Sequence, residues 1–308
     1  MAMSKLKQIA TLLVLLAISA VPVYFFNYRA WLANHWEYHA INYLVQDKTK
    51  EGYDFFNAAV IAPNVYSNYV RRDLASSIPE FYKKDKPLSG GADLIKRSMD
   101  ILQEAANNDP LHYFFHLDIA DSANMIFTFD SSYLDLAEKE LAIAEKLSPR
   151  RQATFYVLSK VKNLKGDKAG AIAAMKKAIA LDSEVGEPHL YYALLLLDNN
   201  QTNEGLEELR LALKLGREPR SADEARVIGG YFADANDYKL AIDYFRTALT
   251  FDPSDDESRL KLGITYYLSG DKNLAQKFIS EVMKTQDLTK SPQYEAIKPI
   301  LLDLDLER

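Results

Sequence analysis

The sequence predicts an all-α fold, in which an N-terminal transmembrane helix is followed by a stack of helix pairs and a C-terminal capping helix. Two observations lead to this prediction. Small and aromatic residues recur with a period of 34 residues, and an uncharged segment of 18 residues lies close to the N-terminus. A repeat of this length indicates a solenoid, because a single helix pair cannot bury its apolar face without neighbours.

The repeat is clearest in the stretch ADEARVIGGYFADANDYKLAIDYFRTALTFDPSD, residues 222–255. Gly229 and Ala241 are small where two paired helices must approach closely, and Phe232 and Phe245 fill the space beside them. These residue types, in this order and at this spacing, resemble the tetratricopeptide repeat, or TPR. The resemblance implies a right-handed solenoid of helix–turn–helix units.

Further copies of the pattern lie on both sides of this stretch. One follows 34 residues later around Gly263, and earlier copies surround Gly205, Ala171 and Ala137. The predicted domains are a short cytoplasmic head (1–8), a transmembrane anchor or signal segment (9–28), degenerate TPR-like hairpins (29–116), TPR repeats (117–287) and a capping helix (288–308).

The uncharged segment IATLLVLLAISAVPVYFF covers residues 9–26. As a helix it would be roughly 27 Å long, close to the hydrocarbon thickness of a bilayer. The alternative is a cleaved signal peptide with a small-residue site at Ala17 and Ser19, although the apolar run continues beyond that site. Two lysines precede the segment and only Arg29 follows it closely. The positive-inside rule therefore predicts a single-pass membrane protein anchored through residues 9–28, with a cytoplasmic N-terminus and the TPR region outside the cytoplasmic membrane.

Composition and motifs exclude several classes of function. The net charge of −6 argues against non-specific binding to nucleic acid. The chain has no cysteine, which excludes disulfides, thiolate catalysis and cysteine-bound metals. His35 with His39, and His112 with His116, have the i,i+4 spacing that can chelate zinc, but their aromatic neighbours favour simple packing. No nucleophile elbow or phosphate-binding motif precedes a helix, so we predict no enzyme, no catalytic residue, no cofactor and no bound metal.

The TPR resemblance also implies where a partner would bind, because the first helix of each pair lines the concave face in this family. The candidate groove residues at that phase are Tyr156, Lys160, Leu190, Leu194, Leu197, Arg226, Leu260, Ile264 and Tyr267. The alternative for the very apolar helix at 190–197 is burial on both sides by neighbouring repeats. The family's clamp for acidic chaperone tails uses Lys and Asn, which Tyr156, Leu190 and Arg226 largely replace here. The expected partner is therefore a helix or extended segment of some other protein.

The whole layout also resembles the C-terminal part of bacterial O-antigen ligase and polymerase-like membrane proteins, in which a last transmembrane helix leads into a repeat tail. The stretch AEKLSPRRQATFYVLSKVKNLKGDKAGAIAAMKKAIALD, residues 144–182, carries this resemblance. It implies a bacterial envelope protein connected with surface polysaccharide. The glycan-transferring residues of that family lie between many membrane helices, so none is carried over. We predict a membrane-anchored TPR scaffold for protein–protein interaction; the alternative is an accessory tail, or fragment, of such a ligase.

Overall fold

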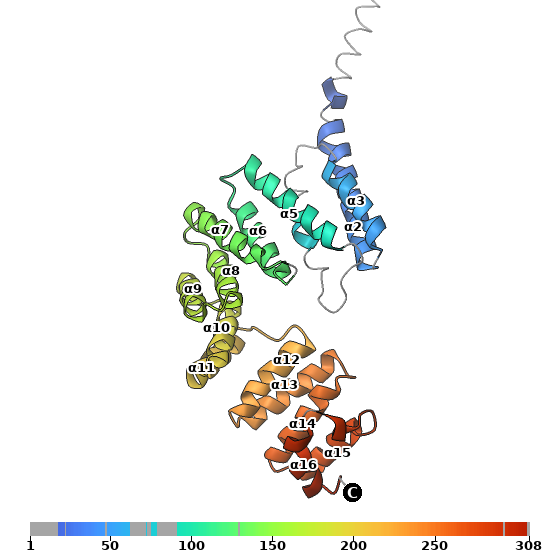
Figure 1. The fold of residues 1–308 in the computed structure, drawn as a ribbon, viewed down its shortest axis with the longest axis vertical. Coiled ribbons are helices and arrows are strands. Elements are labelled where there is room, and N and C mark those ends of the chain that lie inside the picture. Colours follow the sequence, from blue (N-terminus) through green and yellow to red (C-terminus); the bar gives the residue numbers. More distant parts are fainter. Residues whose placement is uncertain are drawn as a thin grey trace, which may run out of the picture. The chain divides into compact units, whose positions relative to one another are not determined.

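The computed structural model describes residues 18–21, 23–46, 48–61, 72, 75–78, 91–128, 130–291 and 293–306. These residues form helices and, within the described ranges, no strand, which confirms the all-α prediction. They belong to two compact units, Met1–Asp182 and Ser183–Arg308, and each unit has an apolar core of its own (Figure 1).

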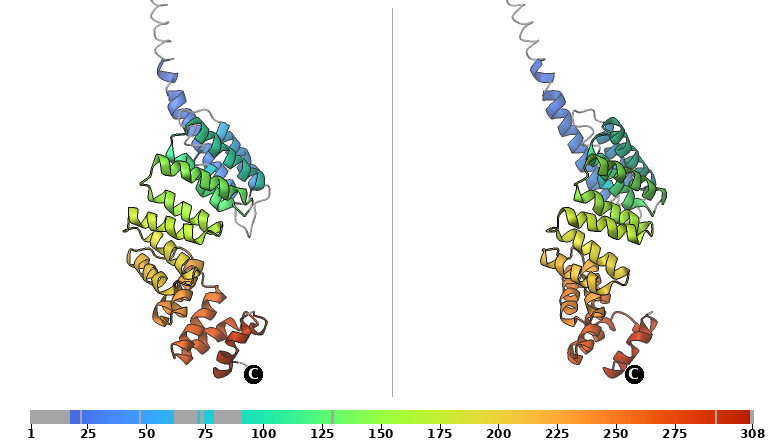
Figure 2. Two further views of the ribbon diagram at one scale, coloured as in Figure 1. Left: turned by 60° about the vertical axis from the view of Figure 1, so that its left-hand side comes forward. Right: turned by 90° about the vertical axis from the view of Figure 1, so that its left-hand side faces the viewer.

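The first unit consists mainly of paired helices joined by short turns. After the π-helix η1 (Val23–Tyr28), its elements are α2 (Arg29–Val45), α3 (Thr49–Ile61), α5 (Gly91–Asn108), α6 (Tyr113–Ile126), α7 (Ser132–Leu147), α8 (Gln152–Leu164) and α9 (Lys168–Leu181). Helix α2 packs against α3, α6 against α7 and α8 against α9 (Figure 2).

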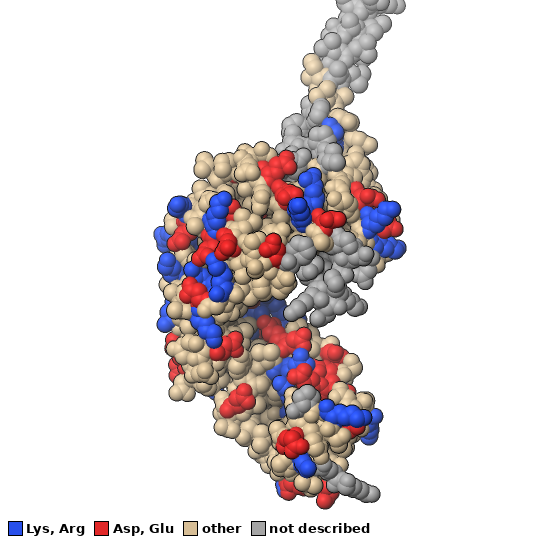
Figure 3. All heavy atoms as spheres, in the orientation of Figure 1, with Lys and Arg blue, Asp and Glu red and all other residues tan. Residues whose placement is uncertain are grey.

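The second unit repeats the same arrangement. Its elements are α10 (Gly186–Asp198), α11 (Thr202–Lys214), α12 (Ala222–Asp234), α13 (Tyr238–Phe251), α14 (Asp256–Leu268), α15 (Lys272–Val282), the 3-10 helix η2 (Leu288–Lys290) and α16 (Tyr294–Asp303). Helices α10 and α11, α12 and α13, and α14 and α15 form the pairs. Acidic and basic side chains are mixed over the face of the described chain that Figure 3 displays.

The turn inside a pair has a recurring construction. A residue with positive φ follows the end of the first helix in four successive pairs: Gly166, Asn200, Asn236 and Gly270. Glycine and asparagine adopt this left-handed region at little cost. In three of the turns an aspartate follows and accepts a hydrogen bond from a backbone N–H in the first turn of the second helix: Asp167, Asp237 and Asp271. The side chain thereby satisfies one of the unpaired amides at the helix N-terminus.

The small and aromatic positions of the repeat meet inside each pair, as the pattern predicts. A Cβ atom on Gly229 of α12 would lie 2.9 Å from Cε1 of Phe245 and 3.3 Å from the carbonyl oxygen of Ala241, both in α13. Phe232 and Phe245 are at most 1% exposed. The glycine is therefore required by the close approach of the two helices.

The connection between α11 and α12, residues 215–221, is longer than the other turns of the second unit. Arg217 lies within it and is 7% exposed. Its guanidinium forms ion pairs with Glu187 of α10 and Glu224 of α12, and it also donates to the carbonyl oxygen of Glu218. One buried cation thus joins two successive helix pairs.

The predicted capping segment 288–308 contains η2 and α16. Ile297 and Leu301 of α16 are buried in the core of the second unit. Gln276 of α15 donates to the carbonyl oxygen of Leu304 at 3.0 Å, which fixes the end of α16. This helix therefore covers apolar surface at the end of the last pair.

The predicted localisation is corrected by the structure. Among the helices of the described ranges, none combines the length and the apolar character needed to cross a membrane. Residues 9–17 and Pro22 of the predicted span lie outside the described part. In the described part of the span, residues 18–21 are helical, and η1 leads into α2, which carries Arg29 and Glu37. The prediction of a single-pass membrane protein is contradicted by this finding.

Candidate binding groove

The predicted groove residues belong to both units. Tyr156 and Lys160 lie on α8 of the first unit. The others lie on three helices of the second unit: Leu190, Leu194 and Leu197 on α10, Arg226 on α12, and Leu260, Ile264 and Tyr267 on α14.

On α8, Tyr156 and Lys160 contact each other. The Lys160 ammonium lies 4.5 Å from the centre of the Tyr156 ring, a cation–π contact. Tyr156 packs on the core, and Asp121 of α6 lies close to Lys160. Burial raises the pKa of Asp121, and the positive charge of Lys160 partly offsets that shift. These three side chains therefore form a polar cluster on the first helices of two successive pairs, and sequence analysis identified only two of its members.

The leucines of α10 contribute mainly to packing. Leu190 is 3% exposed and belongs to the core of the second unit. Leu194 and Leu197 are partly buried against the same core. A Cβ atom on Gly205 of α11 would lie only 2.7 Å from Cγ of Leu197, so this leucine packs inside its own helix pair. The geometry therefore favours the alternative in which the helix is buried by its neighbours.

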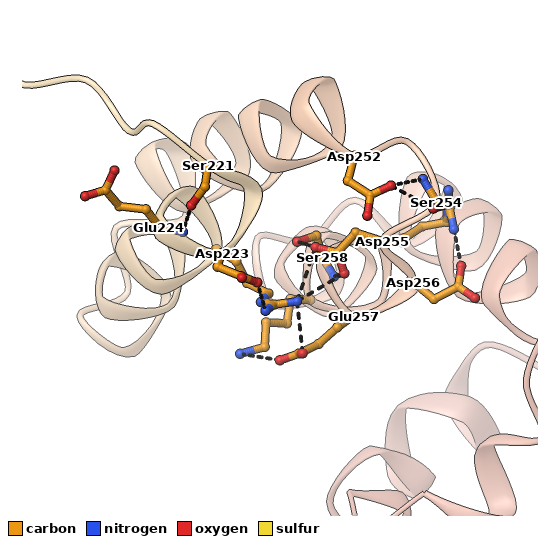
Figure 4. Close-up of polar contacts among 12 residues, drawn as sticks. Ser221, Asp223, Glu224, Asp252, Ser254, Asp255, Asp256, Glu257 and Ser258 are labelled. Atoms are coloured by element: carbon orange, nitrogen blue, oxygen red, sulfur yellow. Dashed lines mark hydrogen bonds and ion pairs between the residues drawn. The ribbon is translucent and has the colours of Figure 1, made fainter. Parts of the chain in front are cut away.

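Arg226 lies in a network of charges that connects α12 to the start of α14. Figure 4 shows its carboxylate partners Asp223, Asp255 and Glu257. Its guanidinium lies 3.1 Å from Oδ1 of Asp255 and 3.0 Å from Oε2 of Glu257, and it also pairs with Asp223. Lys261 lies 3.4 Å from the other oxygen of Glu257. The charge of Arg226 is thus compensated within the protein.

Asp255 is the most buried carboxylate of this network. Burial by itself would raise the pKa of Asp255. Hydrogen bonds from the side chain and backbone of Ser258, together with the charge of Arg226, outweigh that effect and hold the pKa below its ordinary value of 3.8. Asp255 is also the N-cap of α14 and accepts from the backbone N–H of Ser258 at 3.0 Å.

Two further residues of α14 have structural contacts. Leu260 is 6% exposed and belongs to the core. The Tyr267 hydroxyl donates a hydrogen bond to Asp303 of α16, which raises the pKa of Tyr267. Lys272 lies 2.6 Å from the same carboxylate. Tyr267 thus attaches the capping helix to the last pair.

Ile264 lines open space. It borders a cavity of about 290 Å³ between α12 and α14. The other lining residues are Gly230, Ala233, Asp234, Phe245, Lys261, Thr265, Leu268 and Gln293. A Cβ atom on Gly230 would meet no atom within 4 Å, in contrast to its neighbour Gly229. The missing side chain at position 230 therefore enlarges the cavity and is not required by packing.

Exposed apolar side chains extend the cavity into a groove. Val227 of α12 is 45% exposed and Leu268 of α14 is 49% exposed. Leu268 itself lines the cavity, and Val227 lies one helical turn from Gly230 on α12. We call the surface formed by Val227, Gly230, Asp234, Lys261, Ile264 and Leu268 the α12–α14 groove. The two adjacent glycines in the sequence could have indicated this groove. Helix packing requires glycine at position 229 but not at position 230.

The histidine pairs do not combine into a metal site within the described ranges. No group of three metal-binding side chains comes together there. Nδ1 of His116 lies 2.6 Å from a carboxylate oxygen of Glu140, and its Nε2 lies 3.0 Å from the carbonyl oxygen of Pro110. The rings of His35 and His39 meet edge to face at 4.5 Å within a series of stacked aromatic rings. His116, His35 and His39 thus have contacts with neighbouring side chains or backbone within the described ranges.

Comparison with known proteins supports the fold. No protein-family model matches the sequence, and no curated protein matches it. Solved structures do match. PilF of Pseudomonas aeruginosa has a TM-score of 0.57 at 14% identity, over 75% of this chain and 98% of PilF. YrrB, described as a TPR protein with an unusual peptide-binding site, has a TM-score of 0.51 at 17% identity, over 64% of this chain and 97% of YrrB.

The resemblance to O-antigen ligases receives no support from these comparisons. At identities this low a structural match speaks for the fold and not for a shared function. The paired helices, the 34-residue period and the similarity to YrrB together give the described chain the fold of TPR proteins.

Proposed function

We propose that this protein is a non-catalytic scaffold that binds a segment of another protein in the α12–α14 groove. The single observation that carries the proposal is the cavity between α12 and α14, which Gly230 leaves open, which exposed Leu268 lines, and beside which Val227 is exposed. A cavity of about 290 Å³ is large enough for one or two amino-acid side chains and too small for most cofactors.

The arrangement suits a side chain presented by a peptide segment. Ile264, Ala233 and Leu268 supply apolar contact, and Asp234 and Lys261 supply polar groups at the edge of the cavity. Apolar anchors in pockets bordered by polar groups are typical of interfaces between a domain and a peptide. The similarity to YrrB, a protein described as having a peptide-binding site, agrees with this use of the fold.

Site-specific photocrosslinking in the parent cell tests the proposal. A benzophenone side chain replaces Leu268 in the groove in one variant and Phe251 at the end of α13 in a control. The two side chains are equally exposed, at 49% each, so the control reports non-specific capture at the same accessibility. We expect discrete crosslinked adducts from position 268 that are absent from position 251.

A second substitution makes this test specific for the cavity. Gly230→Phe places a large side chain where the structure has open space, and it should abolish the adduct formed at position 268. Equal adducts from positions 268 and 251, or an adduct that is unaffected by Gly230→Phe, would overturn the proposed function. Nothing in the described residues specifically favours the alternative role as an accessory tail of a polysaccharide ligase.

A further inference from the structure

The exposed charges around the α12–α14 groove have mainly one sign. Asp223 has 82% of its side chain exposed and Glu257 has 49% exposed. Asp234 lines the cavity and is exposed, and Asp198 of α10 is exposed beside Tyr231 of α12, whose hydroxyl donates to it at 2.6 Å. Four carboxylates therefore surround the groove at exposed positions.

The cations of the same surface are already compensated. Arg226 is 20% exposed and contacts Asp255, Glu257 and Asp223. Lys261 is the more exposed cation, at 36%, and lies beside Glu257. The same ion pairs also engage Asp223 and Glu257, so the acidic character comes from the excess: five carboxylates, at positions 198, 223, 234, 255 and 257, stand against two cations. An incoming anionic segment would also face Asp234 in the lining of the cavity. Juxtaposed like charges oppose binding, whereas opposite charges steer encounter and select partners.

The apolar part of the groove accepts a side chain without charge. Ala233, Ile264 and Leu268 form an apolar part of the cavity lining, and the remainder of the lining includes polar side chains such as Asp234 and Lys261. Val227 is exposed one helical turn from Gly230. The cavity thus offers apolar contact on one part of its lining and an excess of carboxylates around it, and the two features select different residues of the same segment. A large aliphatic or aromatic side chain fits the pocket, and lysine or arginine on either side of it matches the border.

We propose that the segment bound by the α12–α14 groove is basic and amphipathic, with one large apolar anchor residue flanked by lysine or arginine. This inference rests on the proposed function and specifies the chemistry of the partner. It differs from the recognition of acidic chaperone tails, which needs free cations on the concave face.

Selection from a library of random peptides displayed on phage tests the partner chemistry with the full chain as the target. We expect the enriched peptides to carry one Leu, Met, Phe or Trp together with several Lys or Arg residues. Their binding should fall by about tenfold or more in Asp234→Lys, which corresponds to about 1.4 kcal/mol, and it should weaken as salt is added. Gly230→Phe should abolish it.

Asp243→Lys is the matched control for charge. It makes the same change of net charge at an exposed position on α13, the partner helix of α12. Binding of the enriched peptides should be unchanged in this variant. Far-UV circular dichroism of all three variants establishes that the helices are intact.

The possible failures are distinguishable. Peptides that depend on the groove but are acidic, or that carry an apolar anchor without cations, would overturn the inference and leave the proposed function standing. Peptides that bind Asp234→Lys and Asp243→Lys equally well would also overturn the inference and leave the proposed function standing. If no peptide is enriched in a manner that depends on Gly230, and photocrosslinking at position 268 also fails, both proposals are overturned.

Discussion

Alanine at position 229 and alanine at position 230 should have opposite effects on stability, although the two glycines are adjacent in α12. At position 229 the new methyl carbon would lie 2.9 and 3.0 Å from two ring carbons of Phe245 and 3.3 Å from the carbonyl oxygen of Ala241. The ring cannot withdraw easily, because Phe245 is 1% exposed. At position 230 the methyl carbon meets nothing within 4 Å.

The expected magnitude follows from two opposing effects. Replacing glycine by alanine inside a helix stabilises it by about 0.5–1 kcal/mol. Overpacking a filled core costs about 1–3 kcal/mol. Gly230→Ala experiences only the first effect and should be stabilised. The helix-propensity gain is common to both variants, so the difference between them should be about 1–3 kcal/mol, the overpacking cost alone.

Urea denaturation followed by far-UV circular dichroism measures this difference. Fluorescence is less suitable, because the only tryptophans, Trp31 and Trp36, lie in α2 of the first unit. Amide hydrogen exchange in α12 and α13 shows whether the change is local, since repeat proteins open pair by pair. If Gly229→Ala were as stable as Gly230→Ala, the close approach of α12 to α13 would not be what requires glycine at position 229.

Two further predictions concern charged side chains of the second unit. The pKa of Asp255 is lower in the folded protein than its ordinary 3.8, so its charge stabilises the fold above that pH, and the contribution is lost as pH falls through the folded value. The stability difference between wild type and Asp255→Asn should therefore be largest near neutral pH and shrink below about pH 4; a constant difference in urea denaturation would contradict this. Arg217→Ala should cost about 2–3 kcal/mol, less than the roughly 3–5 of a fully buried pair, because Glu187 and Glu224 keep some solvent. Faster hydrogen exchange confined to α10 and α12 would identify the site, and unchanged exchange there would refute the assignment.

The helix pairs could be predicted from the sequence because their determinants are local. A glycine or asparagine with positive φ marks four of the turns, and in three of them an N-capping aspartate follows, so these turns are defined by interactions within a few residues. The small residues, such as Gly229 and Ala241, mark the contact between helices of one pair. Both kinds of signal can be recognised in a single sequence, because they recur at a constant period.

The groove was less predictable, because a residue's phase on a helix does not say what its side chain contacts. Leu190 and Leu260 have the phase of the concave face, but the core covers them. Tyr267 has the same phase, but its hydroxyl is bonded to Asp303 of the capping helix. The sequence analysis did not select Gly230, because a glycine has no side chain to contact a partner. It is the absence of that side chain that leaves the cavity open.

The membrane prediction rested on the hydropathy of residues 9–28 alone. Within the described ranges no helix is both long enough and apolar enough to cross a membrane, and residues 9–17 and Pro22 lie outside those ranges. An apolar composition identifies a candidate span, whereas a span also requires a helix of sufficient length.

The recurring turns have a consequence for how such a chain can change in length over evolution. Gly166 and Asn200 are one period apart, as are Asn236 and Gly270, and each turn is completed by atoms from its own neighbourhood. An in-frame duplication or deletion of one period would therefore restore an intact turn at the junction. The connection around Arg217 is the exception, because that cation needs a carboxylate from the pair before it and another from the pair after it. We therefore expect gain or loss of a helix pair to be tolerated on either side of this connection. A change that separates Arg217 from Glu187 or from Glu224 should be tolerated less well.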